Sequence, residues 1–576
     1  MRRTSFQHVQ PKVSGNGKAG ASDAQKQTRS RGGKKTPPQA AVLLSLVKDQ
    51  VFFHAPDLTA FAVVRVEVDG QEHEETLPVK RQDFRNWLAR QFYLKTKKAA
   101  SGGILQDVLN VLEGRARYEG EQRNVWCRTA QDNGKVYIDL ADREWRVVEV
   151  DAGGWRIVND SPIHFRRPRG MLALPEPRKG GTLDELRPFL NLDPEKEDWV
   201  LVVGWLVQAI HPTGPYPVLN LHGEQGSAKS TISRVLRELI DPSKAPLRTV
   251  PRDERDLVIA ASNSWLMTLD NLSNLGRDGW LSDALCRLST GGGFATRELY
   301  TDSDEILLDV QRPVVLNGIE ELALRPDLLD RGIVFHLPEL PEHARRTERE
   351  FWGRFSEAKH RIFGALLTAL SLALRHRDEV ATEGLPRMAD FAQLAEAAGR
   401  GLGWAPGTFL DAYEDNRNEV NSRALEASIL YDPLRTLLAG KTRWQGTGQQ
   451  LLEELTREVP EKKAKSRGWP KMPHVLSGML RRIMKNLRKD GIRLEFGRDG
   501  SKRNDRIIVI SVEQSCKRAS EASESVRTET PDDQLAQGWP DEAELSDASD
   551  ASDAETHNDS MNAEDDEILE GIDPFF

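Results

Sequence analysis

The sequence predicts an α/β protein, in which an α/β core with a helical subdomain lies between an N-terminal α+β domain and a small C-terminal module. Three observations predict this fold. The apolar run Pro217–Leu221 leads into a Gly-rich turn and then a helix with one apolar face. Two further apolar runs end in the polar residues Asp270 and Asn317. Leu, Ala and Phe recur at helical spacing over residues 341–436.

Charge is distributed unevenly along the 576 residues. The formal net charge of −9 by itself argues against nucleic acid as a partner. However, residues 1–40 carry nine Lys and Arg against one acid, and residues 441–512 carry eighteen against eight. Residues 519–576 carry nineteen acids and one base. Such asymmetry indicates nucleic-acid contact or regulatory tails.

Three cysteines, far apart and odd in number, argue against a disulfide framework or a zinc site. The longest apolar run, Trp199–Ile210, is too short to span a bilayer, and the N-terminus has no apolar segment typical of a secretory signal. We therefore expect a cytoplasmic protein with no membrane partner.

Composition divides the chain into six expected segments. They are a disordered basic arm (1–40), an α+β domain (41–175), an α/β nucleotide-binding core (176–340), a helical subdomain (341–440), a basic module (441–512) and a disordered acidic tail (513–576).

Within 41–175, strands are expected at 61–68, 135–140, 145–150 and 155–158, and helices at 83–93 and 103–113. Asp139 and Asp142 are too isolated for a polymerase-type metal pair, and turn positions are the favoured interpretation. The role of this domain stays open between an oligomerisation collar and a decayed primase.

The strongest local pattern is a strand, a Gly-rich loop and a helix, as a phosphate-binding loop requires. Backbone N–H groups of such a loop surround a phosphate, and the helix dipole adds positive potential. Lys229 would reach the β- and γ-phosphate oxygens of ATP, and the Ser230 hydroxyl would hold Mg²⁺. A methyl group at Ala228, where Gly is usual, is tolerable if that residue is already helical. The expected nucleotide-binding residues are Gly223, Glu224, Gln225, Gly226, Ser227, Ala228, Lys229, Ser230 and Thr231.

A second strand ends at Asp270, about forty residues after the loop, which is the form of a Walker B element. Asp270 would bind Mg²⁺ through water. The next residue is Asn271, where Glu is usual, and an amide cannot accept a proton from water. The general base therefore stays open among Asp270, Glu224 and Asp256.

The third strand ends at Asn317, which is suited to sensing the γ-phosphate. Arg331 lies on a turn before another core strand and is expected to act as an arginine finger toward a neighbouring subunit. The alternative is that Arg325 and Arg331 form local ion pairs with Asp327 and Asp330.

The order of these motifs, GEQGSAKST (223–231), LMTLDN (266–271), TGGGFATRELYTD (290–302), VVLNG (314–318) and DLLDR (327–331), resembles AAA+ ATPases of the superfamily 3 helicase type. The similarity is to phage, plasmid and poxvirus primase–helicases and to ATP-binding proteins of prophages and integrative elements, over residues 180–512. The resemblance implies ring oligomers, usually hexamers, that translocate on DNA. It also implies that residues 285–300 form a pore-lining hairpin with Arg297 near its tip.

The basic module reads as two helices (449–459 and 473–489) and a hairpin (492–496 and 506–510), a pattern that resembles a winged helix. A helix of this kind enters a major groove while the wing meets phosphates. A solvated basic face used for subunit packing is the alternative. Basic residues left for the exposed arc of the second helix are Arg481, Arg482, Lys485, Arg488 and Lys489. The expected DNA-binding residues are Arg481, Arg482, Lys485 and Arg488 on this helix, Lys502 and Arg503 on the wing, and Arg297 of the pore-lining hairpin.

The acidic C-terminus ends in two phenylalanines, which resembles the partner-docking tips of single-stranded-DNA-binding proteins. Three interpretations stay open: a tip that docks a replication protein, a DNA mimic that covers the basic module, and a solubilising tail.

These patterns predict an ATP- and Mg²⁺-dependent DNA helicase or translocase that replicates a mobile genetic element, with single-stranded or forked DNA and further copies of itself as partners. Two alternatives remain. One is an ATP switch without translocation, such as a loader or defence ATPase; the other is a DNA-binding regulator whose nucleotide serves assembly.

Overall fold

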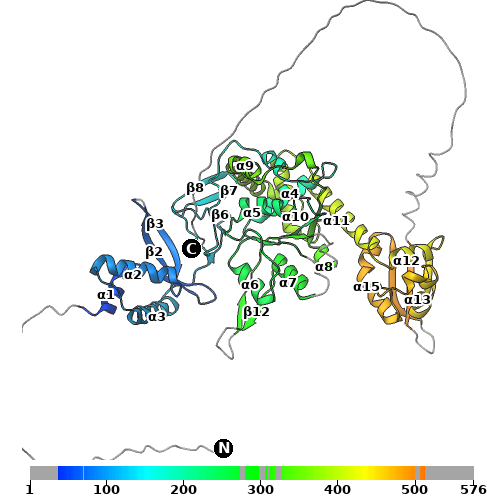
Figure 1. Ribbon diagram of the computed structural model, residues 1–576, viewed down its shortest axis with the longest axis horizontal. Helices are drawn as coiled ribbons and strands as arrows, with labels where there is room; N and C mark the ends of the chain where they lie inside the picture. The colour runs from blue at the N-terminus through cyan, green and yellow to red at the C-terminus, as the bar shows by residue number, and fades with distance from the viewer. Residues whose placement is uncertain are drawn as a thin grey trace, which may run out of the picture. The chain divides into compact units, whose positions relative to one another are not determined.

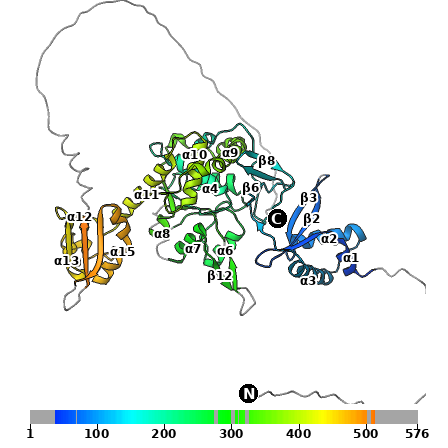
Figure 2. The ribbon, with the colours of Figure 1, turned by 180° about the vertical axis from the view of Figure 1, so that it is seen from behind.

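The computed structural model describes residues 37–68, 70–272, 279–297, 305–308, 310–318, 326–499 and 506–512 (Figures 1 and 2). Most of the predicted basic arm, the whole acidic tail, Arg325, Lys502 and Arg503 lie outside these ranges. Within the described ranges, no helix is long and apolar enough to cross a membrane. The same ranges contain no group of three or more His, Cys, Asp or Glu side chains placed to hold a metal ion.

The N-terminal part is a three-stranded antiparallel sheet with three helices packed on one face (Figure 1). Alternate residues of the middle strand, Ala60, Ala62 and Val64, lie in the core shared with the helices, as the two-residue period of a strand requires. The predicted strand and the two predicted helices are confirmed. The elements are α1 (Gln39–Leu46), β1 (Val51–His54), β2 (Ala60–Val68), β3 (Gln71–Pro78), α2 (Gln82–Thr96) and α3 (Gly102–Tyr118).

A second antiparallel sheet follows, with strands β5 (Thr129–Asp132), β6 (Lys135–Asp139), β7 (Val147–Asp151) and β8 (Gly154–Val158) in sequential order. Its inward residues share one hydrophobic core with α4 (Asp198–Ile210) and α9 (Glu348–His376). Ser371 of α9 donates a hydrogen bond to the Asp151 carbonyl at 2.6 Å. The segment expected as one domain at 41–175 thus contributes to two separate cores. The short strands β4 (Val125–Trp126) and β9 (His164–Phe165) pair alongside.

Asp139 and Asp142, favoured above as turn residues, both form ion pairs. Asp139 is the buried last residue of β6 and accepts from the Arg167 guanidinium at 2.9 Å. Asp142 lies in the β6–β7 connection and accepts from Arg146 at 2.6 Å. The turn interpretation is therefore wrong for Asp139 and holds for Asp142.

The central sheet consists of four parallel strands in the order β11 (Met267–Leu269), β14 (Val314–Gly318), β10 (Val218–His222) and β15 (Gly332–His336). A single parallel bridge from Arg248 to Leu269 extends it beyond β11. Both faces are buried, as is typical of parallel sheets. On β10, Leu219 and Leu221 face the core that contains α4, α5 (Lys229–Ile240) and α9, whereas Val218 faces the core that contains α6 (Glu254–Ser262) and α7 (Gly279–Thr290). All four carboxyl ends therefore lie along one edge of the sheet.

Helices fill most of residues 341–440, as predicted (Figure 2). The C-terminal module has its own core around the sheet β16–β18–β17, against which α13 and α15 pack. Strand β16 was not predicted; it turns the expected hairpin into a three-stranded sheet. The elements are η1 (Leu183–Phe189), η2 (Glu342–Ala344), η3 (Arg377–Glu379), α10 (Ala389–Gly401), α11 (Thr408–Glu426), α12 (Tyr431–Leu438), β16 (Arg443–Thr447), α13 (Gly448–Arg457), α14 (Glu461–Ala464), α15 (Pro473–Lys489), β17 (Ile492–Arg498) and β18 (Arg506–Val512).

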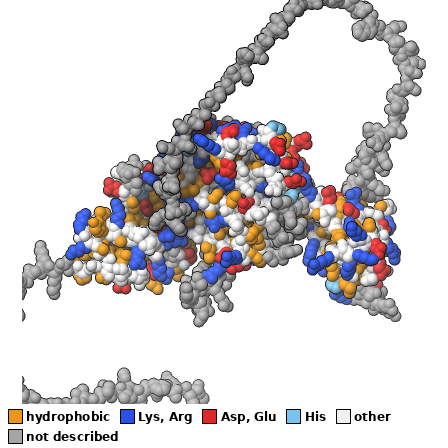
Figure 3. All heavy atoms as spheres, in the orientation of Figure 1, with side chains coloured by type: hydrophobic (Ala, Val, Ile, Leu, Met, Phe, Trp, Pro, Cys, Tyr) orange, Lys and Arg blue, Asp and Glu red, His pale blue; other side chains and the backbone are white. Residues whose placement is uncertain are grey.

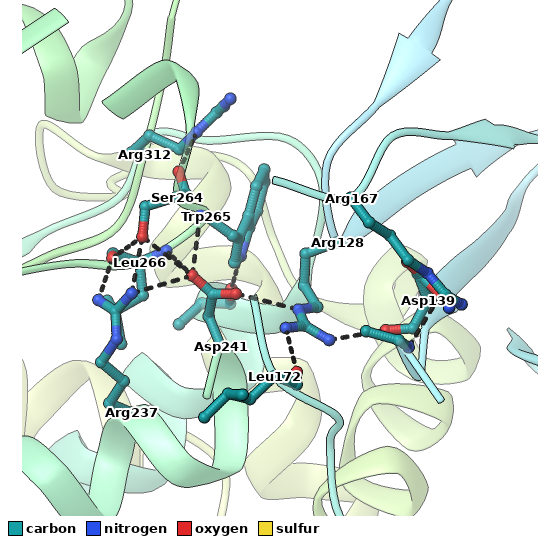
Figure 4. A network of polar contacts seen from close by, with 12 residues as sticks. Arg128, Asp139, Arg167, Leu172, Arg237, Asp241, Ser264, Trp265, Leu266 and Arg312 are labelled. Atoms are coloured by element: carbon teal, nitrogen blue, oxygen red, sulfur yellow. Dashed lines mark hydrogen bonds and ion pairs between the residues drawn. The ribbon is translucent and has the colours of Figure 1, made fainter. Parts of the chain in front are cut away.

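Asp241, directly after α5, joins three parts of the chain in the buried interior (Figure 4). Its carboxylate accepts from the Arg128 Nε at 3.0 Å and from the Arg237 Nη2 at 3.4 Å. It also accepts from the backbone N–H groups of Trp265 at 2.9 Å and Leu266 at 3.2 Å, just before β11. Burial raises the pKa of Asp241, but the two arginine charges outweigh burial and lower it, so the carboxylate stays ionised.

We expect Asp241→Asn to lower the free energy of unfolding by about 3–5 kcal/mol, because Arg128 is then a buried charge without its counter-ion. Urea unfolding measures the change. Asp184→Asn is the matched control: Asp184 pairs with Arg187 at 2.7 Å, but the two side chains are 70% and 54% exposed. Asp184→Asn should lower the free energy of unfolding by less than about 0.5 kcal/mol. Equal small losses for both variants would show that Asp241 does not hold these segments together.

Candidate nucleotide-binding site

The loop between β10 and α5 lies at the carboxyl edge of the central sheet, where ligands of open α/β sheets bind. A Cβ at Gly223 would meet the Ser227 Oγ at 2.6 Å and the Leu337 carbonyl at 2.9 Å, so only glycine fits. Gly226 has φ of +90°, which also favours glycine. The two glycines let the chain turn tightly and present the N-terminus of α5 to the loop.

Lys229 is the first residue of α5, and its ammonium group is turned back into the loop. The Nζ atom donates to the carbonyls of Gly223 at 2.7 Å and Glu224 at 2.6 Å. A third contact reaches the Ser227 Oγ at 3.3 Å. Partial burial lowers the pKa of Lys229, and the charge of Asp270 partly offsets this effect. The ammonium group therefore lies where a phosphate bound in the loop would meet it.

Ala228 does not have the helical conformation that would make its methyl group tolerable without strain. Its φ is +64° and its ψ is +20°, in the left-handed region, immediately before α5 begins. A left-handed conformation costs a non-glycine residue about 1–2 kcal/mol. The usual glycine at this position is thus explained by backbone conformation, and the chain carries strain inside the loop.

Ser230 and Asp270 are brought together across the loop. The Ser230 hydroxyl donates to the Asp270 Oδ1 at 3.0 Å, with Asp270 placed one residue after β11. A hydroxyl and a carboxylate are the hard oxygen ligands that Mg²⁺ prefers, and Mg²⁺ sites usually combine one or two such groups with phosphate oxygens and water. The donor set fits the expected metal.

Asn317 is buried and holds the residue after Asp270. Its Oδ1 accepts from the Asn271 backbone N–H at 2.8 Å, and its Nδ2 donates to the Ser233 Oγ at 3.3 Å. Asn271 itself has φ of +54°, a conformation that asparagine tolerates better than most residues. Asn317 therefore ties β14, α5 and the end of β11 into one unit.

The three candidate general bases differ in place. Asp270 is engaged with Ser230, as described. Glu224 is exposed in the loop, and Asp256 lies in the first turn of α6, where its backbone N–H donates to Asp253.

Arg331 lies between α8 (Pro326–Leu329) and β15, and its Nη1 donates to the Asp327 carbonyl at 3.0 Å. Asp330 is the carboxylate of a different cluster: it accepts from Arg387, Arg417 and Lys485. The alternative interpretation paired Arg331 with Asp327 or Asp330. The contacts of Asp330 described here are with Arg387, Arg417 and Lys485, and do not include Arg331.

Two further polar groups lie at this edge and were not predicted from the sequence: Asn191 and the histidine pair His222–His336. The Asn191 amide donates to the carbonyls of Pro338 at 2.7 Å and Ser227 at 3.3 Å, and so joins the loop to the segment after β15. His222 and His336 end the paired strands β10 and β15, with ring centroids 5.1 Å apart. Burial, with the nearby charge of Arg423, lowers the pKa of His336 to about 4. The two histidines could have been found from the sequence, because each is the polar residue that ends an apolar strand.

The expected hairpin lies between α7 and β14. Strand β12 (Phe294–Arg297) pairs antiparallel with β13 (Glu305–Leu308), and β12 extends beyond α6 and α7 in Figures 1 and 2. Residues 285–290, expected as part of the hairpin, belong instead to α7. Arg297 is the last residue of β12, and the tip lies outside the described residues.

The basic residues of α15 fall into two groups. Lys485 pairs with Asp330 at 2.7 Å, and Lys489 donates to Asn418 at 3.5 Å. Arg481 lies over the Phe496 ring at 4.7 Å, and Arg482 and Arg488 are exposed. Lys and Arg side chains are visible over this module in Figure 3. Two of the five basic residues of α15, one of them the candidate DNA-binding residue Lys485, thus contact the turn before β15 and helix α11.

A loop with an inward lysine and a Ser–Asp oxygen pair has the chemistry of a phosphate-binding site, and two family models define the protein more closely. Residues 183–420 match the actinomycete integrative conjugative element replication protein (AICE RepA), and residues 431–531 match the AICE RepA C-terminal domain. Together these stretches cover more than half of the chain. The chain belongs to this family of replication proteins of mobile elements, which confirms the predicted resemblance to proteins of integrative elements.

Solved structures show weaker similarity. The A-form apo structure of the NrS-1 C-terminal region is 12% identical with a TM-score of 0.36, covering 82% of this chain and 99% of that chain. JCV helicase with a bound acetamide compound is 12% identical with a TM-score of 0.22, covering 41% and 65%. No curated protein matches the sequence.

We expect Ala228→Gly to raise the free energy of unfolding by up to about 1 kcal/mol, because relief of the left-handed strain exceeds the added chain entropy of glycine. Thermal unfolding measures the change. The control is Ala89→Gly within the right-handed helix α2, which should lose about 0.5–1 kcal/mol. Destabilisation by both variants would contradict the strain at Ala228.

Proposed function

We propose that the protein is an ATP-hydrolysing AAA+ motor of the superfamily 3 type that translocates on or melts DNA during replication of an integrative element. The observation that carries the proposal is the convergence of Lys229, Ser230 and Asp270 at the carboxyl edge of a parallel sheet, in a chain of the RepA family.

In this proposal the loop between β10 and α5 binds the phosphates of ATP. Lys229 exchanges its contacts with the Gly223 and Glu224 carbonyls for phosphate oxygens and neutralises their charge. Ser230 would hold Mg²⁺ directly and Asp270 would hold it through water, and the ion would neutralise further phosphate charge. Asn317 would sense the γ-phosphate, and it also fixes the backbone at Asn271.

The larger assembly is also a proposal. We infer a homo-oligomeric ring, with six subunits expected, in which Arg331 reaches the nucleotide of a neighbour as an arginine finger and the β12–β13 hairpin lines the pore.

The C-terminal module acts as a winged helix that binds DNA phosphates, supported by its net basic sequence and exposed Arg482 and Arg488. The segment 41–175 has no assigned activity, and the acidic tip remains a candidate docking segment for a replication protein.

An ATP switch without translocation is the second candidate. One observation favours it: Asn271 stands beside Asp270 and cannot accept a proton from the attacking water. Such a protein would bind MgATP and change conformation with slow turnover.

DNA-stimulated ATP hydrolysis and strand displacement of a forked duplex, measured on the same preparation, test the proposal. We expect turnover with displacement in the wild type. Lys229→Ala should lose turnover by at least about 100-fold, because electrostatic stabilisation of the transferred phosphoryl group is a large part of catalysis. Ser45→Ala is the control, because this exposed hydroxyl donates to the local Val42 carbonyl, outside the candidate site; turnover of this variant should stay unchanged.

The outcomes separate the candidates. Turnover without displacement would favour the switch. Nucleotide binding without turnover would contradict the motor and favour a DNA-binding regulator.

A further inference from the structure

Asp330 is the point where three separate parts of the chain meet in one ion-pair cluster. Its Oδ2 accepts from Lys485 of α15 at 2.7 Å and from Arg387, before α10, at 2.6 Å. Its Oδ1 accepts from Arg417 of α11 at 3.2 Å. The carboxylate is 10% exposed, and the net charge of the cluster is positive because three cations surround one carboxylate.

The cluster keeps Asp330 ionised. Burial raises its pKa, but hydrogen bonds from Lys485 and Arg387 and the charge of Arg417 lower it well below the usual aspartate range. The carboxylate thus remains an acceptor for all three cations at neutral pH.

The three cations that contact Asp330 differ in their exposure to water. The Arg417 side chain is 17% exposed, Arg387 is 45% exposed and Lys485 is 59% exposed. Lys485 therefore has the most contact with water. If Lys485 leaves, Arg387 and Arg417 still compensate Asp330, so departure leaves no buried charge without a counter-ion.

The turn that carries Asp330 is firmly connected to the nucleotide-binding edge. The Asn416 side chain of α11 accepts from the Val334 N–H at 3.1 Å and donates to the Val334 carbonyl at 2.7 Å, which fastens α11 to β15. β15 pairs along its length with β10, the strand that leads into the phosphate-binding loop. Asp330 also directly precedes Arg331, the expected arginine finger.

We propose that Asp330 is a positioning residue that holds helix α15 on the central part of the protein through Lys485, and that a DNA phosphate competes with Asp330 for the same ammonium group. DNA binding then releases α15 from the turn that carries Arg331. This inference rests on the proposed DNA-binding role of the C-terminal module and adds a regulated contact between that module and the ATPase core.

DNA affinity of the full chain, measured without nucleotide on a labelled forked oligonucleotide at low salt, tests the competition. Asp330→Asn should tighten DNA binding by up to about fivefold, the range expected for loss of one ion pair whose cation is exposed to water. Lys485→Met should weaken binding. In the Lys485→Met background, Asp330→Asn should have no further effect, because the ammonium group over which they compete is gone.

Two further variants sharpen the test. Arg387→Met removes a competitor for the Asp330 carboxylate, so Lys485 is held more tightly and DNA binding should weaken; this effect too should vanish with Lys485→Met. Arg387 is half-exposed, so this variant keeps the test usable if Asp330→Asn fails to fold. Arg482→Met is the matched control, because Arg482 is an exposed cation on the same helix. This variant should weaken DNA binding but preserve the full effect of Asp330→Asn.

Equal tightening by Asp330→Asn with and without Lys485 would overturn the proposal, since it would report only the loss of a negative charge. If DNA binding is intact but insensitive to Asp330 and Arg387, the competition is wrong and the proposed function stands. If no form of the protein binds DNA, both the competition and the proposed DNA-binding role are wrong.

Discussion

The structure depends most on the buried carboxylate of Asp241. It lies between Arg128 and Arg237, and the three side chains are at most 3% exposed. An ion pair in this position is costly to desolvate, but removing one partner is more costly still. Arg128 belongs to the segment before β5, Arg237 to the helix that follows the β10–α5 loop, and the backbone donors to the segment that enters β11. One carboxylate thus fixes the second sheet, α5 and the strand of Asp270 relative to one another.

The candidate site follows from this constraint. α5 is held at its C-terminal end by Asp241 and at its N-terminal end by the glycine loop, so Ser230 and Asp270 meet at hydrogen-bond distance. Asn317 then fixes the backbone beyond Asp270, and Asn191 fixes the loop from the opposite direction. The strain at Ala228 lies inside this frame, which is where a structure can hold an unfavourable backbone conformation.

The parts of this arrangement that are local in sequence could be predicted. The strand, loop and helix around Lys229 are contiguous, and α15 was predicted with its observed bounds because its apolar residues recur at helical spacing. The left-handed conformation of Ala228 could not be predicted, since alanine ordinarily favours the right-handed region and only loop closure imposes the other. Asp241 pairs with a residue 113 positions away, and Asp330 with one 155 positions away, so no local pattern reveals either contact. Strand β16 was missed because Gln445 and Gly446 interrupt its apolar pattern, and its pairing partner is β18 at the end of the module.

The central claim is that the β10–α5 loop binds a nucleotide phosphate with Mg²⁺ held by Ser230 and Asp270. Calorimetric titration of the full chain with a non-hydrolysable ATP analogue, with and without Mg²⁺, tests it most directly. The account predicts one site per chain whose affinity rises with Mg²⁺, and in which Asp270→Asn removes the Mg²⁺ dependence. Absence of binding, or binding of equal strength with and without Mg²⁺, would contradict it.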